Sequence, residues 1–319
     1  MRKHLAVLAA LILAAALAAC AEVAPTQPPP VAGQGSSVEG DAQTGIAVED
    51  QAQDQAPVGS ETPPDPAPAA TYGSIGEVTP SHLSEIAERF GVNDHTVGWL
   101  GVPGTNINDV VVRNPDDRDN LYYLRRNFYR EPYFYGVLYI DFRADLGPTR
   151  EHLGVNTTIY GHTVSDDPES GDFDIMLGNL HRFRDPEFMR ENPYIFFSLP
   201  GEDLAFEIVA VFFGNVMNPA FSYNNNHPDP GDFIHVLENE VLPRSLYVFD
   251  HSFELTDRFL TLTTDVLTPP EGAVLDSPFS MYRFGVTARL LDPSAPRAEY
   301  ATFTLNENRT IDPDGMWSN

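Results

Sequence analysis

Cysteine is nearly absent from this chain of 319 residues, which has a single one, Cys20, close to the N-terminus. An intramolecular disulfide is therefore excluded, and so is a thiol nucleophile in the folded part of the chain. The stability of that part must come from packing, for which the 20 Phe and 13 Tyr residues offer a large apolar surface.

Basic residues are also scarce. The 19 Lys and Arg residues stand against 46 Asp and Glu residues, so that the formal net charge at pH 7 is −27. A surface this acidic repels the phosphate backbone of nucleic acids. We therefore expect no nucleic acid among the partners of the protein.

One apolar run is long enough to be a targeting segment, and it lies at the N-terminus. Residues 1–19 begin with Arg2 and Lys3 and continue with an apolar stretch that ends at Ala19, which is typical of a lipoprotein or secretory signal peptide. The stretch is short for a transmembrane anchor, which needs about 20 residues. It runs into Leu-Ala-Ala-Cys, which resembles a bacterial lipobox and implies cleavage before Cys20 and lipid attachment to its thiol. A chance cysteine after an alanine-rich run is the alternative.

The next segment, residues 20–71, has neither Lys, Arg nor an aromatic residue and is rich in Ala, Pro, Gln and acidic residues. Such a composition cannot bury enough apolar surface to fold, so we predict an acidic, disordered spacer behind the lipidated Cys20. We expect this anchor to hold the protein at the extracellular face of the bacterial cytoplasmic membrane.

The folded part begins near Tyr72 and is dominated by short apolar runs between turn signals. About eight strands with this spacing predict a β-sandwich or a β-barrel. The runs lie at residues 97–104, 107–113, 134–142, 156–162, 193–199, 204–213, 245–250, 258–265 and 282–291. We expect the barrel domain to span residues 72–292, followed by a partly ordered extension over 293–319.

Helical patterns interrupt the strands at three places. The first, residues 79–91, has Ser81 as the expected N-cap and Gly91 as the expected stop. Its apolar residues follow the spacing i, i+3, i+4, i+7, so we expect this helix to pack on another part of the fold. These residues are Leu83, Ile86, Ala87 and Phe90. The other two patterns cover residues 185–192 and 231–245.

Three chemically capable residues lie at strand ends. His162 comes just after a strand and follows Gly161, whose backbone freedom allows a tight turn. Asp265 ends the run 258–265, in which Leu and Thr alternate, and Arg283 lies at the start of the last long run. Residues at the ends of separate strands can converge at one mouth of a barrel, so we expect these three side chains to form a site.

Several stretches, taken in order, resemble the class B sortase family over residues 80–291. They are VGWLGVPGTNINDVVV (97–112), NLYYLRRNF (120–128), GVLYIDFRAD (136–145), NTTIYGH (156–162), MLGNLHRFRDPEF (176–188), DFIHVLENEV (232–241), RFLTLTTDVL (258–267) and YRFGVTARL (282–290). Each is a weak signal alone, whereas their order and spacing are specific. The resemblance implies a mainly β fold, a sortase-type eight-stranded β-barrel with an N-terminal helix and peripheral helices.

The resemblance also implies roles for the three residues. In the family, a cysteine thiolate attacks a threonine carbonyl of a sorting signal, a histidine acts as general acid and base, and an arginine stabilises the oxyanion or orients the thiolate. By position, His162 is the histidine, Arg283 is the arginine, and Asp265 occupies the place of the cysteine. The sequence therefore departs from the family at its nucleophile.

Asp265 is a poor substitute for that nucleophile, because attack of a carboxylate on an amide would give a mixed anhydride. We instead expect Asp265 to pair with His162 and Arg283 as a fixed ion cluster. Two catalytic alternatives stay open. Thr263 or Thr264 could act as nucleophile, or a second carboxylate could join Asp265 in a hydrolase. The candidates for that carboxylate are Asp141, Asp166, Asp167 and Asp257.

Two hypotheses on function follow. The first is a non-catalytic sortase homologue at the cell surface that keeps the peptide groove and binds a sorting-signal-like peptide or a surface protein. The second is an active transpeptidase or hydrolase of sorting signals that uses a residue other than cysteine. The histidines show no metal-like pairing, so we expect neither a metal nor another cofactor.

Overall fold

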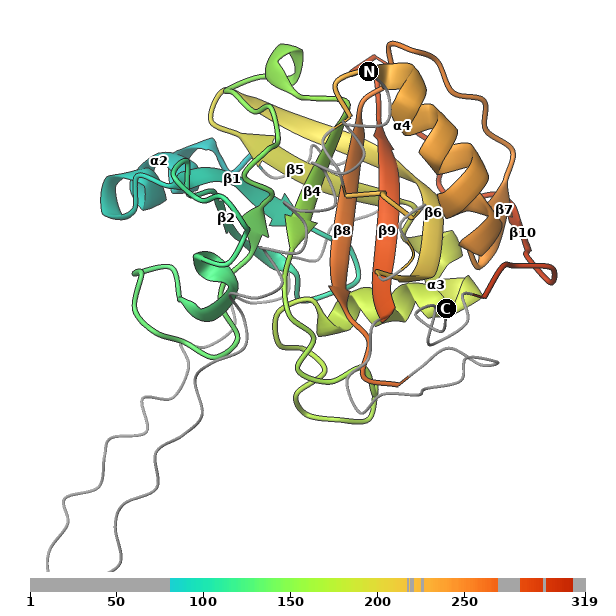
Figure 1. The fold of residues 1–319 in the computed structure, drawn as a ribbon, viewed down its shortest axis with the longest axis horizontal. Coiled ribbons are helices and arrows are strands. Elements are labelled where there is room, and N and C mark those ends of the chain that lie inside the picture. Colours follow the sequence, from blue (N-terminus) through green and yellow to red (C-terminus); the bar gives the residue numbers. More distant parts are fainter. Residues whose placement is uncertain are drawn as a thin grey trace, which may run out of the picture. The chain divides into compact units, whose positions relative to one another are not determined.

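The computed structural model describes residues 81–216, 218, 221–224, 227–268, 282–294 and 297–311. The predicted signal peptide, Cys20 and the spacer over 20–71 lie outside these residues. Eight strands close into a barrel in the order β1-β2-β3-β4-β8-β9-β6-β5 (Figure 1). The prediction of a mainly β fold with an eight-stranded barrel is confirmed.

The barrel strands are mostly antiparallel to their neighbours. They are β1 (Thr96–Gly101), β2 (Asn108–Val112), β3 (Tyr139–Ile140), β4 (Asn156–Tyr160), β5 (Tyr194–Leu199), β6 (Glu202–Asn215), β8 (Phe259–Asp265) and β9 (Tyr282–Leu290). The pairs β2–β3 and β4–β8 are parallel. The longest strand, β6, shifts register against β9 between Ile208 and Ala210, an irregularity of the kind that lets a long strand bend around a barrel.

The run at 245–250 forms a strand, β7 (Tyr247–Phe249), that is not part of the barrel. Both edges of the neighbouring strand β6 are already taken by β5 and β9. β7 instead pairs with β10 (Phe303–Leu305), a strand in the extension that the sequence predicted to be partly ordered. Tyr247 connects this small sheet to the domain. Its ring packs on Phe303 with centroids 4.5 Å apart, and its hydroxyl donates to the Phe183 carbonyl at 2.8 Å.

The N-terminal helix, α2, spans Leu83–Val92 beside β1 (Figure 1). Two details of the sequence prediction are wrong. His82, not Ser81, is the N-cap and makes no side-chain cap bond, and the helix continues one residue past Gly91. The apolar stripe also packs incompletely, since Ile86 is buried while Phe90 is 53% exposed. The helix meets the barrel through the turn that holds Ile86, and its last turns face solvent.

The other two helices, α3 (Pro186–Glu191) and α4 (Pro230–Val236), start with the same Asp-Pro signal. Each aspartate accepts a hydrogen bond from a backbone amide in the first turn, and each proline occupies the first helical position. The pattern over 231–245 is confirmed as helical, although α4 passes into a π-helical turn (Leu237–Val241). The remaining helical turns are of the 3₁₀ type at Tyr123–Arg125, Arg150–His152, Gly178–Arg184 and Leu242–Arg244. In the described part of the chain, no helix is both long and apolar enough to cross a membrane.

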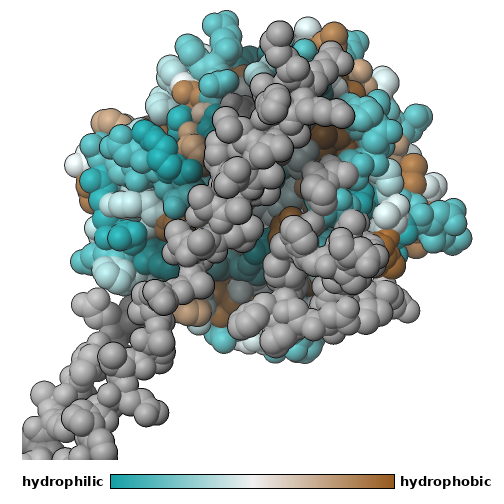
Figure 2. Space-filling model, viewed as in Figure 1, coloured by the Kyte–Doolittle hydropathy of each residue, from teal (hydrophilic) through white to brown (hydrophobic). Residues whose placement is uncertain are grey.

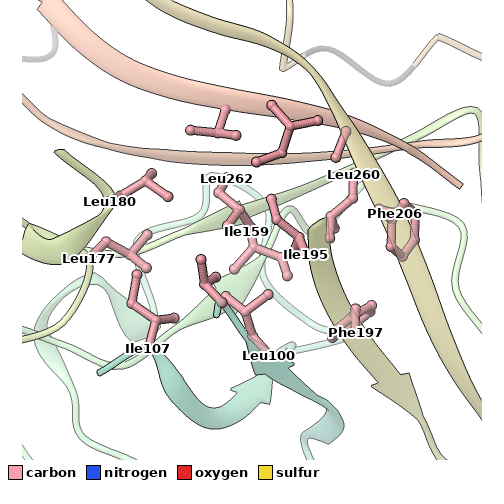
Figure 3. Close-up of a cluster of buried hydrophobic side chains, with 14 of the residues drawn as sticks. Leu100, Ile107, Ile159, Leu177, Leu180, Ile195, Phe197, Phe206, Leu260 and Leu262 are labelled. Carbon is pink, nitrogen blue, oxygen red and sulfur yellow. The ribbon is translucent and has the colours of Figure 1, made fainter. Parts of the chain in front are cut away.

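The barrel is filled by branched aliphatic and phenylalanine side chains from strands all around it (Figure 3). On β8, Leu260 and Leu262 point into this core, because successive residues of a strand face opposite sides. The alternate residues Thr261 and Thr263 therefore face the other side of the strand, where they are buried as well. The face shown in Figure 2 is mostly hydrophilic, which agrees with the high formal charge of the chain.

Candidate functional site

The topology brings the three predicted site residues to one place. The parallel pair β4–β8 has Tyr160 opposite Thr263, so two residues further on His162 lies next to Asp265. The antiparallel pair β8–β9 has Asp265 opposite Arg283. All three occupy the strand positions that face away from the leucine-filled core, so their side chains point the same way.

The Asp265 carboxylate binds both bases. Its Oδ2 atom lies 2.6 Å from Nδ1 of His162, and its Oδ1 atom lies 3.6 Å from Nη2 of Arg283. The side chains are partly exposed, by 16% for His162, 30% for Asp265 and 33% for Arg283. The expected cluster of these three residues is therefore present in the structure.

Gly161 lets the chain before His162 pass close to the barrel core. It does so without an unusual backbone conformation. Its φ does not lie in the left-handed region, where Gly104 and Gly136 are found. A Cβ atom at Gly161 would instead lie 2.6 Å from Leu138 and 2.7 Å from Leu177. The glycine is required because two leucines press against the chain just before His162, so the turn argument made from the sequence is wrong.

Burial and charge act in opposite directions on Asp265. Burial raises the pKa of a carboxyl group, whereas the hydrogen bond from His162 and the positive charges of Arg283 and Arg125 lower it. The sum is a pKa of Asp265 below its ordinary value. Asp265 is thus a stable anion at neutral pH and an acceptor of hydrogen bonds.

The hydroxyl groups next to Asp265 are engaged elsewhere. Thr263 Oγ1 lies 2.8 Å from the Tyr223 hydroxyl, and Thr264 Oγ1 donates to the Gly161 carbonyl at 2.8 Å. Each threonine is only 2% exposed. These contacts make both residues parts of the scaffold and remove the support for a threonine nucleophile.

Two of the candidate second carboxylates also have structural partners. Asp166 accepts hydrogen bonds from the backbone amides of Leu267 and Thr268 and from the Thr268 hydroxyl, and so ties down the chain just after Asp265. Asp141 is held by an arginine, an asparagine and a tyrosine at the end of β3. The Asp265 carboxylate itself pairs with His162 and Arg283. Within the described residues, no group of three or more potential ligands is placed to hold a metal ion.

A second histidine, His181, lies beneath the site and did not follow from the sequence pattern. Its ring stacks on Phe284 with centroids 4.5 Å apart, and its Nε2 atom lies 3.1 Å from the backbone carbonyl of Asp265. Since a carbonyl only accepts, Nε2 carries the proton and donates. Burial lowers the pKa of His181 to about 4, although the hydrogen bond to Asp265 acts in the opposite direction. The stretch 176–188 pointed to this segment but not to the side chain.

This buried neutral histidine predicts an acid-sensitive stability. Unfolding releases His181 to its ordinary pKa of about 6.5, so the unfolded chain binds more protons between pH 6.5 and 4. We therefore expect the free energy of unfolding to decrease as the pH is lowered from 6.5 to 4. His181 contributes up to about 1.4 kcal/mol per pH unit to this decrease. The change His181→Phe keeps the stack and should flatten the slope in urea titrations at a series of pH values. The exposed control His152→Gln should leave the slope as it is, and an unchanged slope in His181→Phe contradicts the prediction.

Arg125 is the other missed residue, and it completes the ring of groups around His162. Its Nη1 atom lies 2.8 Å from Nε2 of His162 and donates to the Phe134 carbonyl at 2.6 Å. The guanidinium also lies over the Phe134 ring, 4.6 Å from its centroid. The stretch 120–128 contains Arg125, but nothing in its pattern indicated which residue would reach the histidine.

Comparison with known proteins agrees with this architecture. No family model matches the chain. Sortase B of Listeria monocytogenes is 28% identical over 196 residues, which are 61% of this chain and 71% of that protein. Sortase B of Staphylococcus aureus is 36% identical over 75 residues, 24% of this chain and 28% of that protein. The crystal structure of Clostridium perfringens sortase B has a TM-score of 0.52 at 26% identity and covers 65% of this chain and 99% of its own.

The chain is thus similar to class B sortases in sequence and in fold. A Staphylococcus aureus structure described as a sortase B-substrate complex also resembles the chain in fold, with a TM-score of 0.52 at 22% identity. The sequence resemblance over residues 80–291 agrees with these comparisons. The roles of His162, Asp265 and Arg283 by position in the family stay predictions.

Proposed function

We propose that the protein is a non-catalytic class B sortase homologue that binds a sorting-signal-like peptide or a surface protein without cutting it. The observation that carries this proposal is the Asp265 carboxylate, which lies between His162 and Arg283 where the family resemblance places a cysteine. The lowered pKa of Asp265 supports it, because an anion held by two bases is a poor nucleophile toward an amide.

The charge at this position also opposes the family's reaction. Acyl transfer builds negative charge on the attacked carbonyl oxygen, and preorganised donors must stabilise that charge. In this chain the guanidinium of Arg283 already faces the Asp265 carboxylate. A peptide could still bind along the strands, since binding depends on contacts other than those of the nucleophile.

The proposal places the protein at the outer face of the cytoplasmic membrane. A lipid on Cys20 and the acidic segment 20–71 would attach the barrel there, within reach of exported proteins. The membrane partner is then the lipid layer that holds the anchor, and the peptide partner is another surface protein. Globomycin inhibition of processing, with Cys20→Ser as the control that is never lipidated, tests this part of the proposal.

The change Asp265→Cys tests the lost nucleophile. We use the full-length chain in detergent, in a Cys20→Ser background, with fluorogenic sorting-signal peptides and triglycine as acceptor. We expect the chain with Asp265 to bind a peptide in fluorescence anisotropy without turnover. The cysteine variant should form a thioester that mass spectrometry detects and should release product.

The matched control is Asp145→Cys, which installs a thiol at an exposed position of the same chain, outside the site. It should give neither a thioester nor product. Turnover by the chain with Asp265 would overturn the proposal in favour of an active transpeptidase or hydrolase. Absence of both peptide binding and thioester formation would show that the groove does not recognise sorting signals.

A further inference from the structure

We propose that Arg125 is a positioning residue that, together with Asp265, fixes His162 as the neutral tautomer with its proton on Nδ1. The inference goes beyond the proposed function, because it concerns the state of the imidazole whether or not a peptide binds. It assigns a role to a residue outside the three predicted from the sequence.

The donor properties of Arg125 determine the protonation of one ring nitrogen of His162, Nε2. A guanidinium has five N–H donors, no acceptor, and stays charged in proteins. Its Nη1 atom lies 2.8 Å from Nε2 of His162, so a hydrogen bond there requires the lone pair of Nε2. A neutral imidazole has one N–H group, which then must be on Nδ1.

The other nitrogen agrees with this assignment. Nδ1 of His162 lies 2.6 Å from Oδ2 of Asp265, whose lowered pKa makes it an acceptor. An N–H on Nδ1 donates to that carboxylate in a short, charge-assisted bond. Arg125 therefore donates to Nε2 of His162, and Nδ1 of His162 donates to Asp265.

Leu124, the residue before Arg125, favours the opposite tautomer, with the proton on Nε2. The Leu124 carbonyl lies 3.2 Å from the same Nε2 atom, and a carbonyl only accepts. If a neutral ring donated from Nε2 to Leu124, the lone pair of Nδ1 would face position 265. Leu124 and Arg125 thus compete for one nitrogen, and the shorter distance of Arg125 and the acceptor character of Asp265 both favour the Nδ1–H form.

The competition matters for the nucleophile. A thiol at position 265 needs a lone pair on Nδ1 to take its proton, which is the form that Leu124 selects. Arg125 selects the other form and so suits a carboxylate there. Arg125 and Asp265 are therefore a matched pair. Restoring cysteine alone leaves His162 with its proton on the nitrogen that faces the thiol, which slows the turnover of Asp265→Cys without abolishing it.

Tautomer measurement by NMR is the direct test. Two-bond ¹H–¹⁵N correlations distinguish Nδ1–H from Nε2–H, and loss of a signal in His162→Gln assigns the ring. We expect Nδ1–H in the full-length chain and also in Asp265→Asn, whose amide can turn either its oxygen or its nitrogen toward Nδ1. Adding Arg125→Met to Asp265→Asn should switch His162 to Nε2–H.

Two controls separate this role from a structural one. Arg126→Met removes a neighbouring arginine that contacts Tyr122 instead of His162, and it should leave the tautomer unchanged. Arg125→Lys restores a donor and should restore Nδ1–H. The proposal is overturned by an Nε2–H ring or a doubly protonated ring in the chain with Asp265. It is also overturned if the double variant Asp265→Asn, Arg125→Met keeps Nδ1–H.

Kinetics of the cysteine variant give the second readout. We expect Arg125→Met to raise kcat of Asp265→Cys by about tenfold or more, with KM within about twofold, because general-base catalysis contributes roughly 10²–10⁴-fold. Arg126→Met should not raise it. If no variant binds a peptide or forms a thioester, the proposed function fails, whereas the NMR result still decides the role of Arg125. An NMR switch without a rise in kcat contradicts the link to the nucleophile.

Discussion

Replacing Asp141 by alanine is expected to lower the free energy of unfolding by about 1–3 kcal/mol, the cost of leaving hydrogen-bond donors without their buried acceptor. Asp141 is 3% exposed and accepts from Nε and Nη2 of Arg143 at 2.8 and 2.7 Å. It also accepts from Asn120 at 2.8 Å and from the Tyr160 hydroxyl at 2.9 Å. The alanine variant leaves these donors without their shared acceptor at the end of β3.

Urea unfolding followed by tyrosine fluorescence and circular dichroism measures this effect. The matched control is Asp145→Ala, which removes an exposed carboxylate four residues away and should change stability by no more than about 0.5 kcal/mol. The Asp141 variant also removes the acceptor of the Tyr160 hydroxyl. Because Tyr160 directly precedes Gly161 and His162, we expect the His162 side chain to be held less rigidly in this variant. A loss below about 1 kcal/mol for Asp141→Ala would show that water replaces the carboxylate without cost, contrary to the reasoning from burial.

Replacing Phe284 by alanine is expected to cost about 3–5 kcal/mol through loss of buried apolar surface and formation of a cavity. Phe284 is fully buried on β9, stacks on His181 at 4.5 Å and packs against Phe213 at 5.0 Å. It lies opposite Thr264, one residue from the pair of Asp265 and Arg283. The variant therefore removes the support beneath the site as well as core volume.

The matched control for this prediction is Phe90→Ala. The Phe90 ring is 53% exposed at the end of α2, so its removal should change stability by no more than about 0.5 kcal/mol. Equal losses for the two variants would contradict the burial argument. A further readout is the acid slope assigned to His181, which should shrink in Phe284→Ala because a cavity next to the ring admits water.

Much of the site could be predicted from the chain because it depends on strand ends. Leucine and threonine alternate along β8, so the face on which Asp265 lies follows from a period of two. His162 and Arg283 lie at the ends of similarly recognisable runs. The short apolar runs left a β-sandwich and a β-barrel open, and the order of the motifs that resemble class B sortases indicated the barrel.

Other features did not follow from local patterns. Phe90 belongs to a helical apolar stripe and is nevertheless exposed, because the pattern shows which face of α2 is apolar but not how far the barrel beneath it extends. The strand β10 has only three residues, too few to be recognised from the sequence, and it forms because β7 offers it a free edge. Gly161 is explained by two leucines that arrive from distant segments.

The residues alone thus specify the acidic surface, the missing thiol, a fold of many short strands and the three polar groups at the strand ends, because composition and strand periodicity are local properties of the chain. The state of His162 is different. Arg125 is 37 residues away in sequence and reaches the ring from a short 3₁₀ turn, while His181 enters from another turn beneath Asp265. Folding decides these contacts, because the position and hydrogen-bond geometry of irregular turns depend on what packs around them.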